Sequence, residues 1–189
     1  MKLSLSDSGD LGHYMNVVGV MGVSLSLLIA FFYQLFFYEL PCPLCLLQRA
    51  GMIMAGLAFM MNVRFGEKGR HYGMALMAAV CTGIIAARQV LLHIVPGSGS
   101  YGSALFGLHF YTWALLSSIS TVIYVAVMLM FYCRNIRTEG RTQLSKFAVL
   151  TLVLFTVLIA ANLVFTMLEC GLGQCADDPT FYNWLVSIY

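Results

Sequence analysis

The chain has 189 residues, of which 60% are hydrophobic and only 10% are charged, with a formal net charge of +2. Soluble domains carry about 25% charged residues, so this composition excludes an ordinary soluble globular protein. No basic patch suggests a nucleic-acid partner, and the length fits one integral membrane domain without a separate soluble domain.

Stretches long and apolar enough to cross a bilayer follow one another along the chain, each near the roughly 20 residues that a span requires. Their predicted bounds are 15–37, 46–63, 72–95, 113–133 and 147–168. The residues before the first stretch lack a short apolar core with a small-residue cleavage site, so we expect them to lead into the first span. The predicted fold class is an all-α integral membrane protein, with a four-helix transmembrane bundle plus an additional fifth transmembrane helix.

The loop arginines and lysines indicate the orientation, because cytoplasmic loops carry an excess of both. All of them lie in the break after the second span and the break after the fourth, and Lys2 lies at the N-terminus. The other two breaks and the C-terminal tail hold none. We therefore expect residues 1–133 to form the four-helix domain with a cytoplasmic N-terminus. Residues 134–189 then add a cytoplasmic loop, the fifth span and a cysteine-containing tail on the outer side.

The segment Cys42-Pro43-Leu44-Cys45 lies in the first outer break, directly before the second span. Two cysteines at this spacing form a catalytic dithiol, a structural disulfide or part of a soft-metal site, and the last reading lacks further ligands with suitable spacing nearby. Arg49 follows Cys45 by about one helical turn, and a cation together with a helix N-terminus favours a thiolate. The pattern favours a catalytic dithiol.

Two arginines, Arg49 and Arg88, fall near the outer ends of predicted spans. Each is either a snorkelling anchor or a cation held for a thiolate, a ligand oxygen or a lipid headgroup. His93 lies near the same surface and is either a proton carrier or an interfacial polar residue. Two further cysteines, Cys81 and Cys133, fall within spans, where we expect small buried side chains.

A second close cysteine pair, Cys170 and Cys175, follows the fifth span. Either a disulfide here only closes a short loop, or the pair is a second redox couple that exchanges with the first pair on the same side of the membrane. The residue types leave both readings open.

The segment Glu39–Arg49, with the sequence ELPCPLCLLQR, resembles the signature of the disulfide bond formation protein B (DsbB) family. Weaker matches follow at Ala86–Val90 and around Trp113, so the resemblance covers roughly 15–133. It implies a DsbB-like domain over residues 1–133 in the bacterial inner membrane, with the outer side in the periplasm. It also implies an enzyme that passes electrons from a thiol oxidase to quinone.

The resemblance implies roles for individual residues. Cys42 exchanges with a disulfide of another protein, Cys45 lies next to the quinone ring, and Arg49 polarises a quinone carbonyl and stabilises the thiolate. The implied cofactor is ubiquinone or menaquinone, and the implied partners are a periplasmic DsbA-like thiol oxidase, the quinone pool and membrane lipid. The candidate cofactor-binding residues are Arg49, Gln48, Arg88 and His93.

The chain departs from the family pattern in the outer loop at 96–112, which has no cysteine where the family carries a second pair. Our hypothesis is that Cys170 and Cys175 replace that pair as the shuttle and so belong to the catalytic set. Two alternatives remain open at this point. One is a vitamin K epoxide reductase-like quinone reductase, and the other is an accessory subunit of a membrane complex with locked disulfides.

Overall fold

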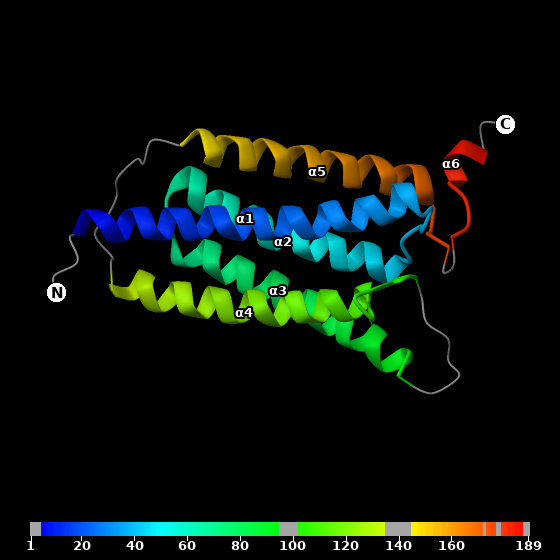
Figure 1. Cartoon of the computed structure of the whole chain (residues 1–189), viewed down its shortest axis with the longest axis horizontal. Helices are drawn as coiled ribbons and strands as arrows, with labels where there is room; N and C mark the ends of the chain where they lie inside the picture. The colour runs from blue at the N-terminus through cyan, green and yellow to red at the C-terminus, as the bar shows by residue number, and fades with distance from the viewer. Residues whose placement is uncertain (1–4, 95–101, 135–144, 172, 177–178, 187–189) are drawn as a thin grey trace.

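The computed structural model describes residues 5–94, 102–134, 145–171, 173–176 and 179–186. Long helices of this part of the chain run side by side as a bundle (Figure 1). All are long and apolar enough to cross a membrane, which confirms the predicted fold class. They are α1 (Leu5–Phe36), α2 (Pro43–Phe65), α3 (Gly69–Leu92), α4 (Phe110–Arg134) and α5 (Lys146–Cys170).

The helix bounds differ most from the prediction at the start of the chain. We expected the first span to begin near residue 15, but α1 begins at Leu5 because the polar N-terminal residues continue the helix. The other helices exceed or shift from their predicted bounds by a few residues. A short helix, α6 (Asn183–Val186), lies in the tail.

A small β-hairpin precedes α4 in a segment that the sequence predicts only as a loop. It pairs β1 (Ala104–Leu105) with β2 (Leu108–His109) in antiparallel register. Phe106 and Gly107 between them have φ values of 53° and 81°. Positive φ at both central residues is the geometry of a type I′ two-residue hairpin turn.

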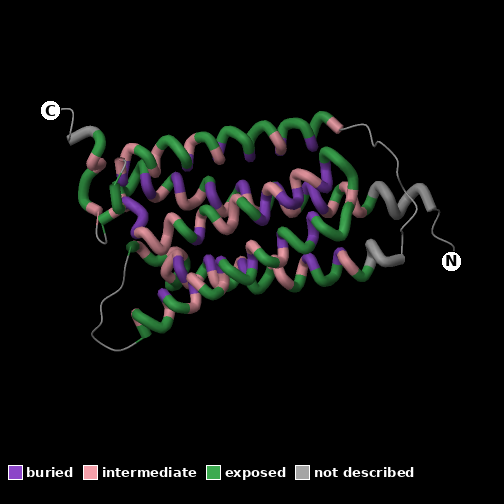
Figure 2. The backbone as a smooth tube through the Cα atoms, turned by 180° about the vertical axis from the view of Figure 1, so that it is seen from behind, coloured by how far each residue is buried: buried purple, intermediate pink, exposed green. Residues whose placement is uncertain are grey.

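Helices α1 to α4 pack against one another in chain order, and α5 packs on one side of them. α2, α3 and α4 pack in chain order, α1 packs on α2, and α5 lies along α1 and α2 on the side away from α4 (Figure 1). Gly56 of α2 permits this contact, because a side chain there would collide with the ring of Phe155. Buried residues face the interior while exposed apolar ones cover the outside, as expected for helices surrounded by lipid (Figure 2).

Two ends of the bundle carry different chemistry. At one end a buried network joins α1, α2 and α3: the Asn62 amide donates to Asn16 over 3.0 Å, and the Asn16 amide donates to the Tyr72 hydroxyl over 2.9 Å. The Asn62 side-chain oxygen also accepts from His71 Nδ1 over 2.8 Å. The other end, where α1 ends, α2 begins and α5 ends, holds both cysteine pairs. We call it the cysteine end.

Candidate functional site

The first cysteine pair forms the start of α2. Cys42 is the N-cap residue, and its sulfur accepts a hydrogen bond from the backbone N–H of Cys45 over 3.2 Å. Pro43 suits the first helical position, where its missing N–H needs no partner. Cys42 is buried, Cys45 is half-buried, and both are free thiols. The local sequence therefore places two sulfurs at the positive end of a helix.

This placement changes the acidity of Cys42. A hydrogen bond with the Cys45 thiol is the main cause that lowers the pKa of Cys42 from 9.0 to about 6. Hydrogen bonds from the Cys45 backbone and the Gln89 amide act in the same direction, while burial opposes them. At neutral pH Cys42 is the thiolate of the pair, which is the reactive form of a cysteine.

Gln89 of α3 contacts both sulfurs, and Gln48 of α2 holds Gln89 in place. The side-chain amide of Gln89 donates to Cys42 Sγ over 3.4 Å and lies 3.7 Å from Cys45 Sγ. Gln48 donates to the Gln89 side-chain oxygen over 2.8 Å. Gln48 and Gln89 are both buried. The Gln48 bond fixes the orientation of the Gln89 amide, so that its N–H groups rather than its oxygen face the sulfurs.

Arg49 points into the protein. Its guanidinium donates to the Gln34 side-chain oxygen over 2.6 Å and to the Ala30 carbonyl over 3.3 Å, both on α1. It also lies 5.6 Å from the centre of the Phe31 ring. These contacts rule out the snorkelling reading for Arg49, because a snorkelling side chain places its charge in the interface.

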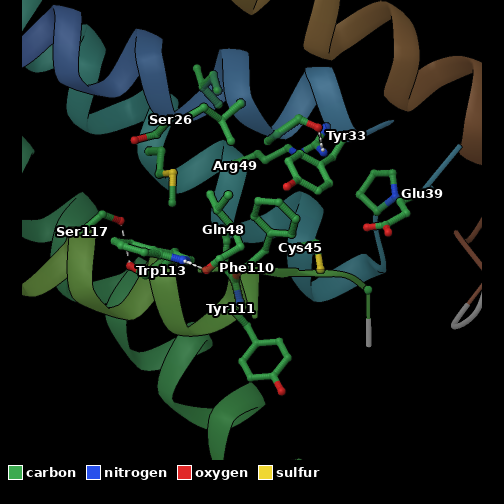
Figure 3. Close-up of a pocket in the computed structure, with 18 of the residues that line it drawn as sticks. Ser26, Tyr33, Glu39, Cys45, Gln48, Arg49, Phe110, Tyr111, Trp113 and Ser117 are labelled. Atoms are coloured by element: carbon green, nitrogen blue, oxygen red, sulfur yellow. Dashed lines mark hydrogen bonds between the residues drawn. The ribbon is translucent and has the colours of Figure 1, made fainter. Parts of the chain in front are cut away.

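A cavity of about 290 Å³ lies between α1, α2, α4 and the hairpin. Cys45, Gln48 and Arg49 reach it from α2, and Phe110 and Trp113 reach it from α4 (Figure 3). The remaining walls are mostly apolar side chains of α1 and α4. The cavity therefore brings one thiol, one amide and one guanidinium together in an otherwise apolar space.

The segment between α1 and α2 is held over this cavity by an acid. Glu39 accepts a hydrogen bond from the Ser103 backbone N–H over 3.0 Å and another from the Ser103 hydroxyl. Glu39 lines the cavity as well. Among the described residues, Glu39 is therefore bonded to the segment before the hairpin and makes no hydrogen bond to the cysteines.

The second cysteine pair is closed. Cys170 and Cys175 are joined by a disulfide, with Cys170 buried at the last position of α5. The tail then returns to α1, where the Tyr182 hydroxyl accepts a hydrogen bond from the Gln34 amide over 3.5 Å. Gln34 therefore connects the tail to Arg49, which lines the cavity.

Two predicted cofactor-binding residues do not line the cavity. Arg88 is exposed on α3, and neither it nor His93 is among the described residues that line the cavity. His93 instead donates to the Gln89 carbonyl over 2.8 Å and stacks on Tyr111, with ring centres 5.2 Å apart. The cavity geometry gives their predicted roles no direct support.

The expectation of buried cysteines within the spans is wrong for Cys81. The structure places the Cys81 thiol on the exposed surface of α3. The side chain of Cys133 lies outside the described residues.

Three buried polar residues at the cysteine end were not assigned a role from the sequence. Gln89 stands next to Arg88 in the weak motif, Gln34 lies inside the first apolar span, and Glu169 precedes the tail cysteines. A polar residue within a span is costly unless it faces the bundle interior, so the positions of Gln34 and Gln89 inside predicted spans were the available signal. Glu169 lies one residue beyond the fifth predicted span and carried no such signal.

The comparisons with known proteins match part of the chain. Residues 13–101 match the family model described as "Disulfide bond formation protein DsbB". Disulfide bond formation protein B of Marinobacter nauticus is 42% identical over 60 residues, which cover 30% of this chain and 36% of that protein. No solved structure matches the chain. The family match contains all of α2 and α3, whereas α4, α5 and the tail lie beyond it.

Proposed function

From the relation of residues 13–101 to the DsbB family, we propose that the protein is a membrane thiol oxidoreductase that generates disulfides and passes the electrons to a quinone. One observation carries the proposal. Cys45 of the reactive dithiol and the cation Arg49 share a wall of one apolar cavity. A redox-active sulfur, a positive charge and space for a flat apolar molecule are the elements that electron transfer from a dithiol to a quinone requires.

The cavity residues fit a quinone ring. Apolar and aromatic walls with a few polar groups are typical of ligand sites, and Phe110 and Trp113 supply flat surfaces. Arg49 has five N–H donors, and its two hydrogen bonds to α1 leave others for a ring carbonyl. When bound, a ubiquinone or menaquinone supplies a two-electron acceptor that also takes up two protons.

The residues around the sulfurs have separate tasks in this proposal. Cys45 faces the cavity and is the sulfur next to the ring, while Cys42 is the sulfur that exchanges with another disulfide. Gln89 keeps the two sulfurs together and stabilises the thiolate by donating hydrogen bonds. Arg49 compensates the negative charge of the dithiol from the α1 side. Thiol–disulfide exchange then runs through Cys42, because the pKa of about 6 makes it the thiolate near neutral pH.

The tail pair serves as the shuttle between Cys42 and a partner. Cys42 is only 6% exposed, which leaves a folded partner protein little surface to attack. Cys170 and Cys175 lie at the same end of the bundle on a short tail that already contacts α1 through Tyr182. An exchange between the tail disulfide and Cys42 would connect the buried dithiol with a periplasmic DsbA-like thiol oxidase.

The cysteine end faces the periplasm in this proposal. The basic loops predicted from the sequence then lie in the cytoplasm of a bacterium, and the thiol chemistry lies in an oxidising compartment. The protein is a multi-pass inner-membrane enzyme, with its N-terminus cytoplasmic and its C-terminus periplasmic.

Thiol-dependent quinone reduction by the purified protein tests the function. We expect the wild type to reduce ubiquinone or menaquinone with a small dithiol as electron donor. Cys45→Ala should reduce the rate to background, and Arg49→Met should raise the KM for quinone by about tenfold or more, as for loss of a charged hydrogen bond. Cys81→Ser is the matched control, because it removes a free thiol that lies away from the cavity.

Two results would contradict the proposal. A wild type that is inactive with both quinones would favour a structural subunit with locked disulfides. Full activity in Cys45→Ala would show that any quinone reduction does not use this dithiol.

A further inference from the structure

The last turn of α5 buries an acid that the proposed chemistry does not yet use. Glu169 is 2% exposed, and within the described part of the chain neither of its carboxylate oxygens has a hydrogen-bond partner. An isolated buried ion costs several kcal/mol, so such a group needs either a compensating charge or a proton. Glu169 directly precedes Cys170, which places it at the cysteine end.

The charges that act on Glu169 come from α2 and its N-cap residue. Glu169 lies one helical turn after Phe165, the Phe165 ring packs against Phe31, and the Arg49 guanidinium lies 5.6 Å from the centre of the Phe31 ring. A positive charge at Arg49 favours a carboxylate on this side of α1, while a thiolate at Cys42 disfavours it. From α1, the hydrogen-bond partners of Arg49 are a neutral amide and a backbone carbonyl. Arg49 is therefore the cation that the carboxylate and the thiolate compete for. The titratable groups that face Arg49 are Cys45, Glu169, Tyr182 and Cys42.

We propose that Glu169 holds a proton while the Cys42–Cys45 dithiol is reduced and releases it when the dithiol is oxidised. In the reduced site the Cys42 thiolate is the counter-ion of Arg49, and Glu169 is neutral. When the thiolate is consumed in the disulfide, the Glu169 carboxylate becomes the counter-ion. The net charge beside Arg49 is the same before and after oxidation, which avoids an unpaired buried charge. This inference rests on the proposed dithiol chemistry.

The electrons and protons balance. The reduced site contains the Cys42 thiolate, the Cys45 thiol and protonated Glu169. Oxidation forms the bond between the two sulfurs and releases two electrons, one proton from Cys45 and one proton from Glu169. A quinone takes up two electrons and two protons to become a quinol, so the site supplies both protons itself.

The test counts the protons bound when the Cys42–Cys45 disulfide is reduced. Full-length, quinone-free protein is equilibrated with glutathione over a pH range just above the Cys42 pKa of about 6. Alkylation and peptide mapping follow these two cysteines separately from the tail pair. After correction for the protons of glutathione, we expect about two protons in the wild type and about one in Glu169→Gln. The constant for the disulfide half-reaction then changes about 100-fold and about tenfold per pH unit, respectively.

Glu67→Gln is the matched control. It neutralises another partly buried glutamate, which is hydrogen-bonded to Tyr72 at the opposite end of the bundle, and it should bind two protons like the wild type. Equal proton numbers in Glu169→Gln and the wild type would overturn the proposal.

A second measurement applies if Glu169→Gln does not fold. Infrared difference spectra of the wild type should show a protonated carboxyl group in the reduced protein and lose it in the oxidised protein, with the band displaced in Glu169→Asp. A carboxyl signal that is the same in both redox states would overturn the inference. Neither measurement contains quinone. A failure of quinone reduction therefore contradicts the proposed function alone, and a failure of these two measurements contradicts the role of Glu169 alone.

Discussion

The two cysteine pairs of this protein lie at the same end of the bundle but at opposite ends of their helices. Cys42 caps the N-terminus of α2, where unpaired backbone N–H groups stabilise negative charge. Cys170 is the last residue of α5, where unpaired carbonyls disfavour negative charge. The helix end therefore stabilises the thiolate of the Cys42–Cys45 pair, whereas the Cys170–Cys175 pair has no such stabilisation.

This contrast gives a direction to electron flow. A dithiol whose thiolate is stabilised has a disulfide that is a stronger oxidant. The Cys42–Cys45 disulfide should accordingly accept electrons from the tail dithiol rather than donate to it. The helix termini alone thus favour the order tail, first pair and quinone that we propose.

The largest effect is expected from variants that break the tail pair. Cys170→Ser or Cys175→Ser should lower oxidation of a DsbA-like partner to background, while reduction of quinone by a small dithiol continues at a rate within about twofold of the wild type. The reason is that the small dithiol reaches Cys42 without the shuttle. Parallel assays with both electron donors check this, and partner oxidation that survives in these variants would make the tail disulfide purely structural.

The acidity of Cys42 provides the next test. In the folded protein its alkylation should rise with pH through a midpoint near 6 and then level off, because the thiolate is fully formed above that pH. In denaturant the midpoint should return toward the ordinary value of 9.0. Cys45→Ala should move the folded midpoint upward, since the Cys45 thiol is the main cause of the shift. A folded midpoint near 9 would remove the contrast between the two pairs.

The relative stability of the two disulfides sharpens the comparison. In glutathione buffers at neutral pH, the Cys170–Cys175 disulfide should remain closed under conditions that open Cys42–Cys45. Opening it should require a ratio of reduced to oxidised glutathione about tenfold higher or more, since one pKa unit corresponds to a factor of ten. Quantitative alkylation followed by peptide mapping measures both in one sample. The reverse order would mean that electrons do not flow from the tail to α2.

The smallest expected effect comes from Gln89. Gln89→Leu removes the hydrogen bond to the Cys42 sulfur and should raise the alkylation midpoint by about 0.5–1 pH unit, as one hydrogen bond is worth about 0.5–1.5 kcal/mol. Arg88→Leu, at the neighbouring exposed position, is the matched control and should leave the midpoint unchanged. A shift in the control but not in Gln89→Leu would assign the effect to charge instead of to the amide.

The architecture was readable from the sequence because each span is a long apolar run, and a bilayer accepts little else. The C-x-x-C segment, Gln48 and Arg49 were also readable, since they follow one another along the chain and share one helix end. Their neighbours in space were not. Gln89 meets the sulfurs only through the register of α3 against α2, and Gln34 meets Arg49 only through the packing of α1.

Local backbone geometry accounts for another part of what was missed. The hairpin before α4 depends on Phe106 adopting a positive φ, which is uncommon for a residue with a side chain and has no sequence signal beyond the glycine that follows. The early start of α1 was missed because polar residues mark the limit of an apolar span without marking the end of a helix.

The placement of the fifth helix has a consequence for how two very different reactants share one enzyme. α5 covers α1 and α2 on one side and carries the tail at its end, while the cavity lies between α1, α2 and α4 on the other side. A lipid-soluble ring and a water-soluble protein would then approach the same sulfurs from opposite flanks. Neither reactant must leave before the other binds, so the enzyme can form a ternary complex with both reactants bound at once.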